Sequence, residues 1–159
     1  MSVAFTKEGD SEASAADLPD RPISPHPNFV TAEGLAALEE ALAAARAAYT
    51  AAQAAGDIGA DRTAMARATR DLRYYGARRA SAQRIDPPPN DGVVRFGSRV
   101  RLEADDGTAL DYRIVGEDEA DPAKGLLSYI APLARALIGQ AVGDTVTVAG
   151  RELEIVGVG

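Results

Sequence analysis

Two alanine-rich runs joined by a short polar turn constrain the fold of this chain most strongly. From Thr31 to about Ala55, the larger residues and alanines recur in steps of three and four, which is the spacing of a heptad seam. These positions are Leu35, Leu38, Leu42, Ala45, Tyr49 and Ala52. A matching stripe on the run Arg62–Ile85 consists of Met65, Ala68, Leu72, Tyr75 and Ala82. Because so few residues join the runs, the sequence predicts two antiparallel helices packed side by side.

The turn Ala54–Asp61 forms the tip of this predicted hairpin. Gly56 and Gly59 allow the positive φ that a chain reversal needs, and Asp57 can cap the following helix. At about 1.5 Å per residue, some 24 helical residues would carry the tip roughly 36 Å from the base. Asp57 and Asp61 are thus exposed carboxylates, and the turn alone is compatible with capping or with chemistry.

The second helix is rich in arginine and contains no lysine. Its arginines are Arg62, Arg67, Arg70, Arg73, Arg78, Arg79 and Arg84. One interpretation is a solvated face that pairs locally with Glu39, Glu40 or Asp71. The other is a face for nucleic acid or an acidic protein, since guanidinium groups bind phosphate and carboxylate in a bidentate way; Arg62, Arg67, Arg70 and Arg73 are the nucleic-acid-facing candidates.

Charge and composition exclude several functional classes. The net charge is −7, and residues 87–159 hold 7 basic and 12 acidic side chains, so a generic duplex-DNA binder is a poor first hypothesis. The chain has no cysteine and one histidine, His26, which argues against disulfides, multi-histidine metal cages and a Ser-His-Asp triad. With no apolar run of about 18 residues and a polar beginning, we expect no membrane association, no secretory signal and a cytoplasmic location.

Proline-rich stretches divide the chain. Residues 1–28 predict a flexible acidic arm in which Pro22, Pro25 and Pro27 exclude helix. Residues 29–86 form the hairpin, 87–92 a stiff linker containing three consecutive prolines, and 93–159 a separate domain.

In that last domain the periodicity changes to short strand-like segments between Gly and Asp turns. The segments are Val93–Phe96, Ser98–Glu103, Asp111–Val115, Leu126–Ser128, Thr145–Val148 and Glu152–Val156. One short helix is predicted over Pro132–Ile138, with Pro132 at its first position and Gly139 after its end. The fold class is therefore α+β: a helical hairpin followed by a small antiparallel sheet with one short helix.

Four segments of this domain closely resemble the GreA/GreB transcription factors: Val94–Ser98, Tyr112–Asp121, Pro132–Gly139 and Val142–Val146. The resemblance implies an amino-terminal antiparallel coiled coil and a carboxyl-terminal domain like that of FK506-binding proteins. It implies a monomer, GreB-like with an altered tip, that docks on bacterial RNA polymerase and inserts its coiled coil into the secondary channel, near nascent RNA and DNA. The chain would then be an accessory factor rather than an enzyme.

The resemblance also implies a role for the tip. Acids there help the polymerase to hold a second Mg²⁺ while it cleaves a backtracked transcript, and no cofactor is intrinsic to the factor itself. Asp57 matches a tip acid of the family, but Ala60 stands where cleavage-competent members have glutamate, and Asp61 follows one position later. Asp57 and Asp61 are the candidates for catalytic support, and Asp57 for a shared Mg²⁺ ligand. The alternatives are a cleavage-deficient regulator that competes for the channel, or an isomerase or chaperone module.

Two segments of the globular domain resemble the surfaces by which the family touches the polymerase. The candidate partner-binding residues are Gly116, Glu117, Asp118, Glu119, Asp121, Ser128, Ala131, Pro132 and Leu133. From composition alone, the acidic run would be a solvated loop and Pro132 a simple helix start.

Overall fold

A computed structural model of the protein describes residues 18–55 and 59–159, with the backbone alone for residues 59–61. The described residues divide into two compact units. The first joins residues 18–27 to residues 37–81, and the second joins residues 28–36 to residues 82–159. Residues 29–36, which the sequence analysis assigns to the hairpin, thus belong to the second unit in the structure.

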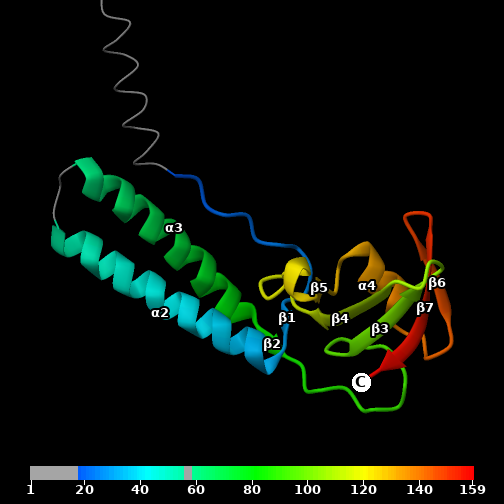
Figure 1. Ribbon diagram of the computed structural model, residues 1–159. Helices are drawn as coiled ribbons and strands as arrows, with labels where there is room; N and C mark the ends of the chain where they lie inside the picture. The colour runs from blue at the N-terminus through cyan, green and yellow to red at the C-terminus, as the bar shows by residue number, and fades with distance from the viewer. Residues whose placement is uncertain (1–17, 56–58) are drawn as a thin grey trace, which may run out of the picture. The chain divides into compact units, whose positions relative to one another are not determined.

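The hairpin consists of α2 (Ala32–Ala55) and α3 (Gly59–Ser81), which lie side by side and run in opposite directions (Figure 1). The predicted seam is confirmed, because its alanines and leucines include the most buried side chains of the hairpin. Those below one-tenth exposure are Leu38, Leu42, Ala45, Ala52 and Ala68. Small side chains at these positions let the two helices approach closely.

Thr31 starts α2, as the sequence predicts. Its hydroxyl oxygen accepts a hydrogen bond from the backbone N–H of Gly34 at 2.9 Å, and its carbonyl accepts one from Leu35 at 2.9 Å. This is the N-cap arrangement, in which a side chain satisfies a helical N–H that has no partner in the preceding turn.

The predicted extension of the second helix to Ile85 is wrong. Helix α3 ends at Ser81, and β2 (Gln83–Arg84) pairs in parallel with β1 (Phe29–Val30). The backbone N–H of Gln83 donates to the carbonyl of Asn28 at 2.8 Å, and that of Ile85 donates to Val30 at 2.9 Å. These long-range hydrogen bonds take the place of the bonds that the backbone N–H groups of residues 83 and 85 would form in a further helical turn.

A five-stranded sheet forms most of the second unit, in the order β5-β4-β3-β7-β6. The strands are β3 (Arg99–Ala104), β4 (Ala109–Val115), β5 (Leu126–Ser128), β6 (Thr145–Val148) and β7 (Arg151–Val158). Three pairings are antiparallel as predicted, but β4 and β5 pair in parallel. The chain leaves β4, passes through a loop and the 3₁₀ turn η1 (Pro122–Lys124), and returns beside β4 in the same direction. Of the expected strand Val93–Phe96, only an isolated bridge between Val93 and Ala141 is present.

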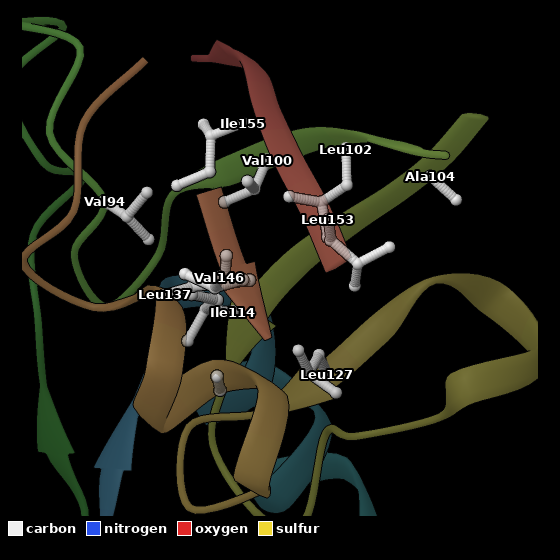
Figure 2. Close-up of a cluster of buried hydrophobic side chains, with 11 residues drawn as sticks. Val94, Val100, Leu102, Ala104, Ile114, Leu127, Leu137, Val146, Leu153 and Ile155 are labelled. Carbon is white, nitrogen blue, oxygen red and sulfur yellow. The ribbon is translucent and has the colours of Figure 1, made fainter. Parts of the chain in front are cut away.

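One face of the sheet carries the core (Figure 2). Along β3 the residues alternate between exposed and buried, so Val100, Leu102 and Ala104 point inward while Arg99 and Arg101 point to the other face. The short helix α4 (Pro132–Leu137) adds Ala134 and Leu137, which are fully buried. The other members of the core are Val94, Ile114, Leu127, Val146, Leu153 and Ile155. The predicted α+β class, with a helical pair followed by a curled sheet and one short helix, is confirmed; the likeness to FK506-binding proteins stays a prediction.

Candidate functional site

The loop after β4 begins at Gly116, where the chain passes directly over residues 29 and 30. A Cβ atom on Gly116 would lie 2.3 Å from the carbonyl oxygen of Phe29, a distance no side chain tolerates. Gly116 is buried, and its own carbonyl accepts a hydrogen bond from Ala120 at 3.1 Å. Glycine is therefore required here by close backbone approach rather than by an unusual φ.

Glu119 holds the same loop from the side. Its carboxylate accepts a hydrogen bond from the hydroxyl of Thr31, the residue that also caps α2. The space beside this contact is small, because a Cβ on Gly34 would lie 2.6 Å from the Glu119 carboxylate oxygen. The Thr31 hydroxyl thus accepts from one backbone group and donates to a carboxylate 88 residues away in the sequence.

The remaining acids of the loop differ in exposure. Asp118 is exposed and Glu117 is half-buried. Asp121 is half-buried, exchanges two backbone hydrogen bonds with Leu126 at 2.9 and 3.0 Å, and lies 3.9 Å from the Lys124 ammonium group. The acidic run is therefore part of an ordered connection between β4 and β5, which backbone hydrogen bonds hold in place.

The second predicted segment lies directly beside the first. Ser128 is the register partner of Val115, the residue before Gly116, and the backbone N–H of Tyr129 donates to Val115 at 2.9 Å. Pro132 is exposed at the start of α4, while Leu133 packs partly against the core. Ala131 is extended and offers no capping side chain. The parallel pairing of β4 and β5 thus brings both predicted partner-binding segments to one end of the sheet.

Three aromatic rings at this end were not predicted as a group. Phe29, Phe96 and Tyr129 have ring centroids 5.5 to 6.1 Å apart, in tilted and edge-to-face arrangements. Such arrangements add about 0.5–1.5 kcal/mol per pair to the burial of the rings. The three residues come from β1, the segment before β3 and the position just after β5, so only the tertiary fold assembles them.

The four arginines predicted to face nucleic acid fall into two pairs. Arg62 and Arg67 are exposed on α3. Arg70 lies 3.3 Å from Asp71, and Arg73 donates to Asp20 at 3.1 Å. Local pairing, the other interpretation of this helix, therefore applies to the second pair, and it also joins Arg79 to Glu39 at 3.0 Å.

The amino-terminal arm was predicted to be flexible throughout residues 1–28, and for residues 18–27 this is wrong. These residues run along α3, where the Arg21 guanidinium lies 3.8 Å from the centre of the Tyr74 ring and 3.7 Å from Asp71. A guanidinium over an aromatic face is attracted by the ring quadrupole. Because these contacts join residues 50 or more positions apart, composition alone gave no sign of them.

The acids of the tip cannot be located in the same way. Asp57 lies outside the described residues, as do Gly56 and Ile58. Asp61 belongs to the first turn of α3, but its side chain is outside the described part. Within the described residues, no cluster of three or more histidine or acidic side chains is arranged to hold a metal ion. A search of the same residues finds no helix with the length and apolar character of a membrane span.

The fold and the paired segments define a class: a helical hairpin followed by a curled sheet whose β4–β5 end carries the candidate surface. Residues 88–158 match the family model described as "Transcription elongation factor, GreA/GreB, C-term". The resemblance to the GreA/GreB family that the sequence predicts is thus confirmed for these residues, which make up less than half of the chain.

Individual relatives agree with this assignment. The chain is 50% identical over 84 residues to the transcription elongation factor GreA of Alkalilimnicola ehrlichii, covering 48% of this chain and 53% of that protein. It is 44% identical over 80 residues to GreB of Yersinia pestis, covering 50% and 49%. The chain thus spans about half the length of the curated relatives it matches.

Solved structures with similar folds include GreA factor homolog 1 of Thermus thermophilus, at 22% identity and a TM-score of 0.40 over 84% of this chain and 99% of that one. A GreA/GreB elongation factor from Nitrosomonas europaea aligns at 22% identity and a TM-score of 0.38, covering 82% and 97%.

Proposed function

We propose that this protein is a GreA/GreB-type transcription elongation factor that binds bacterial RNA polymerase. The observation that carries the proposal is the family match over residues 88–158, which includes both segments of the candidate surface. The polymerase would contact the exposed Asp118 and Pro132, together with the half-buried Ser128 and Leu133. Glu119 and Gly116 would act indirectly, since their contacts with Thr31 and Phe29 fix the course of the loop.

The hairpin would enter the secondary channel of the polymerase. Its helices of 24 and 23 residues give it a reach of about 36 Å at 1.5 Å per residue. Exposed Arg62 and Arg67, near the start of α3, would lie closest to nascent RNA and DNA. Arg70 and Arg73 would be less available, because each already has a carboxylate partner.

Polymerase binding can be tested by retention of the full chain on immobilised core enzyme. The double variant Asp121→Lys, Pro132→Ser should lose about tenfold or more in affinity, because it reverses a charge and alters the start of α4 within the proposed surface. Glu152→Lys, an equal charge reversal at an exposed position of β7, is the matched control and should bind as the unchanged protein does. Equal binding by all three proteins would reject the proposed surface, and no binding by any of them would reject the proposed function.

Transcript cleavage would depend on Asp57 and Asp61, the only acids in the tip turn. Any Mg²⁺ would be shared with the polymerase active site, where carboxylate oxygens supply the hard ligands that this ion prefers. On stalled, backtracked complexes, Asp57→Asn and Asp61→Asn should each slow cleavage if the tip is competent. Polymerase binding without any cleavage by the unchanged protein would instead support the cleavage-deficient regulator, for which Ala60 is the sequence argument.

A further inference from the structure

The outer face of the sheet, opposite the core, holds a groove of about 560 Å³. It runs across β5, β4, β3 and the end of β7, and four cationic side chains line it: Arg99, Arg101, Arg113 and Lys124. Asp111 is the only acidic side chain in its lining. Residues 87–159 are acidic as a whole, with 7 basic and 12 acidic side chains. The groove is lined by four of the basic side chains but by only one of the acidic ones.

Arg99 and Arg113 are directly opposite one another on β3 and β4. The backbone of Arg99 exchanges its hydrogen bonds with Gly159 on the other side, so the Arg99–Arg113 pair is of the non-hydrogen-bonded type. Side chains in such pairs are the closer ones, and like charges placed there repel each other. The pair therefore concentrates positive charge at one place on this face, and an anion bound there would offset the repulsion.

The cations of the groove differ in whether a carboxylate already pairs with them. Arg113 donates to Glu33 at 3.2 Å, and Arg101 donates to Asp111 at 3.1 Å. Among the described residues Arg99 forms no ion pair, and it is exposed. The Glu33 contact shows that the Arg113 guanidinium is positioned to bind an anionic oxygen, and Arg113 also holds the pKa of Glu33 below its usual value, after the larger effect of the Glu33 backbone N–H.

We propose that this groove binds a phosphorylated small molecule through Arg99 and Arg113, with Arg101 and Lys124 at its margins. A phosphate group has three oxygens and up to two charges, so it can accept from two converging guanidiniums, whereas one carboxylate is matched by a single arginine fork. The volume falls in the range of small-molecule sites, of about 300–1,000 Å³. None of residues 116–121 and 128–133 lines the groove, so the proposal goes beyond the proposed function.

Calorimetric titration of the full chain at low salt with inorganic triphosphate and with ATP tests the proposal. Both probes should bind. Addition of 0.5 M salt should weaken the binding strongly, because it shortens the Debye length to roughly 4 Å. Equal affinity would indicate that the groove recognises the phosphates alone, and tighter binding of ATP that it also contacts the nucleoside; both results support the proposal. Failure of both probes to bind at millimolar concentration would overturn it, as would binding of a hexaglutamate peptide in their place.

Arg99→Gln should weaken triphosphate binding about tenfold, which is the loss of one charge-assisted bidentate contact. Arg151→Gln is the matched control, because Arg151 is an exposed arginine of the same sheet outside the groove, and it should change affinity less than about twofold. In the absence of phosphate, Arg99→Gln should leave the melting temperature unchanged or raise it, because a repulsive pair is removed. Triphosphate affinity that is equal in Arg99→Gln and the unchanged protein would overturn the proposal.

Discussion

The two compact units of this protein bury their side chains in different ways. The sheet unit surrounds one core in which Leu102, Ile114, Leu137 and Ile155 are fully buried. The apolar seam of the hairpin is narrow: its covered positions are Ala45, Ala52 and Ala68, with Leu38 and Leu42 as the larger apolar side chains. Arg78 of α3 is also buried, at 2% exposure. Since hydrophobic stabilisation grows with the apolar area removed from water, the sheet unit gains more per residue. The comparison teaches that close packing of small side chains and a few leucines can hold a long helical hairpin together, whereas the domain that matches the family has an extended hydrophobic core.

The strongest test of this difference is Leu102→Ala in the sheet core. Leu102 is 0% exposed and packs within the core cluster, so its truncation should lower the free energy of unfolding by about 4 kcal/mol through lost burial and an unfilled cavity. Urea unfolding followed by circular dichroism measures the loss. Val156→Ala, at a 37% exposed position of the same sheet, is the control and should cost below about 1 kcal/mol.

In the hairpin, Leu42→Ala should cost less, about 2 kcal/mol. Leu42 retains 8% exposure and belongs to a seam whose other covered positions include Ala45, Ala52 and Ala68, so the two helices can close part of the space it leaves. Helical ellipticity at increasing temperature reports this change. If Leu42→Ala proved as costly as Leu102→Ala, the contrast between the two units would be wrong.

A third test concerns the Thr31 hydroxyl, which both caps α2 and donates to Glu119. Thr31→Ala should destabilise the sheet unit by about 1–2 kcal/mol, because Gly34 loses its acceptor and Glu119 its donor. Thr31→Ser keeps the hydroxyl and should restore most of the stability. Amide hydrogen exchange of Gly34 and of loop 116–121 measures both effects; exchange unchanged by Thr31→Ala would contradict the role of this hydroxyl.

A smaller effect is expected where the arm meets the hairpin. Arg21→Gln removes the guanidinium from above Tyr74 and from Asp71, contacts that together are worth about 0.5–1 kcal/mol at a partly exposed site. Limited proteolysis near residues 18–27 should become faster. Arg46→Gln, an exposed arginine of α2 without an ion pair among the described contacts, should leave the cleavage rate unchanged.

The smallest expected effect is on the acid sensitivity of the end of the linker, where Asp91 pairs with Arg95. Two hydrogen bonds from Arg95, at 2.6 and 2.8 Å, together with one from the Val93 backbone, lower the pKa of Asp91 to about 2. Because the folded pKa lies below the unfolded value of about 4, the stabilisation is present above pH 4 and is lost as the pH falls toward 2. Asp91→Asn should reduce that dependence, as NMR titration or unfolding at several pH values would show. An unchanged pH profile would contradict the pairing.

Local patterns made much of this structure predictable. The spacing of Leu38, Leu42 and Ala45 predicted the seam, and the strand-like segment Ser98–Glu103 predicted β3 to within one residue at each end. The family resemblance placed the candidate surface in two segments, which the parallel β4–β5 pairing then brings together.

The features that the sequence did not predict are all long-range. Strand β2 forms because the backbone N–H groups of residues 83 and 85 donate to the carbonyls of residues 28 and 30, although the local sequence favours helix. The bridge from Arg73 to Asp20 and the Arg99–Arg113 pair join positions whose proximity depends on the completed fold. A strand as short as β5 has too few residues for its direction to be read from periodicity.

The bond between Thr31 and Glu119 has a consequence for biosynthesis. Thr31 leaves the ribosome 88 residues before Glu119, so the first turn of α2 must emerge without the carboxylate that later accepts from its cap. Contacts of such separation form late, because the intervening chain has to be ordered first. The base of the hairpin is thus completed only after translation of β4 and its loop, and a nascent chain stalled before residue 116 would carry an amino terminus that is helical but not yet anchored.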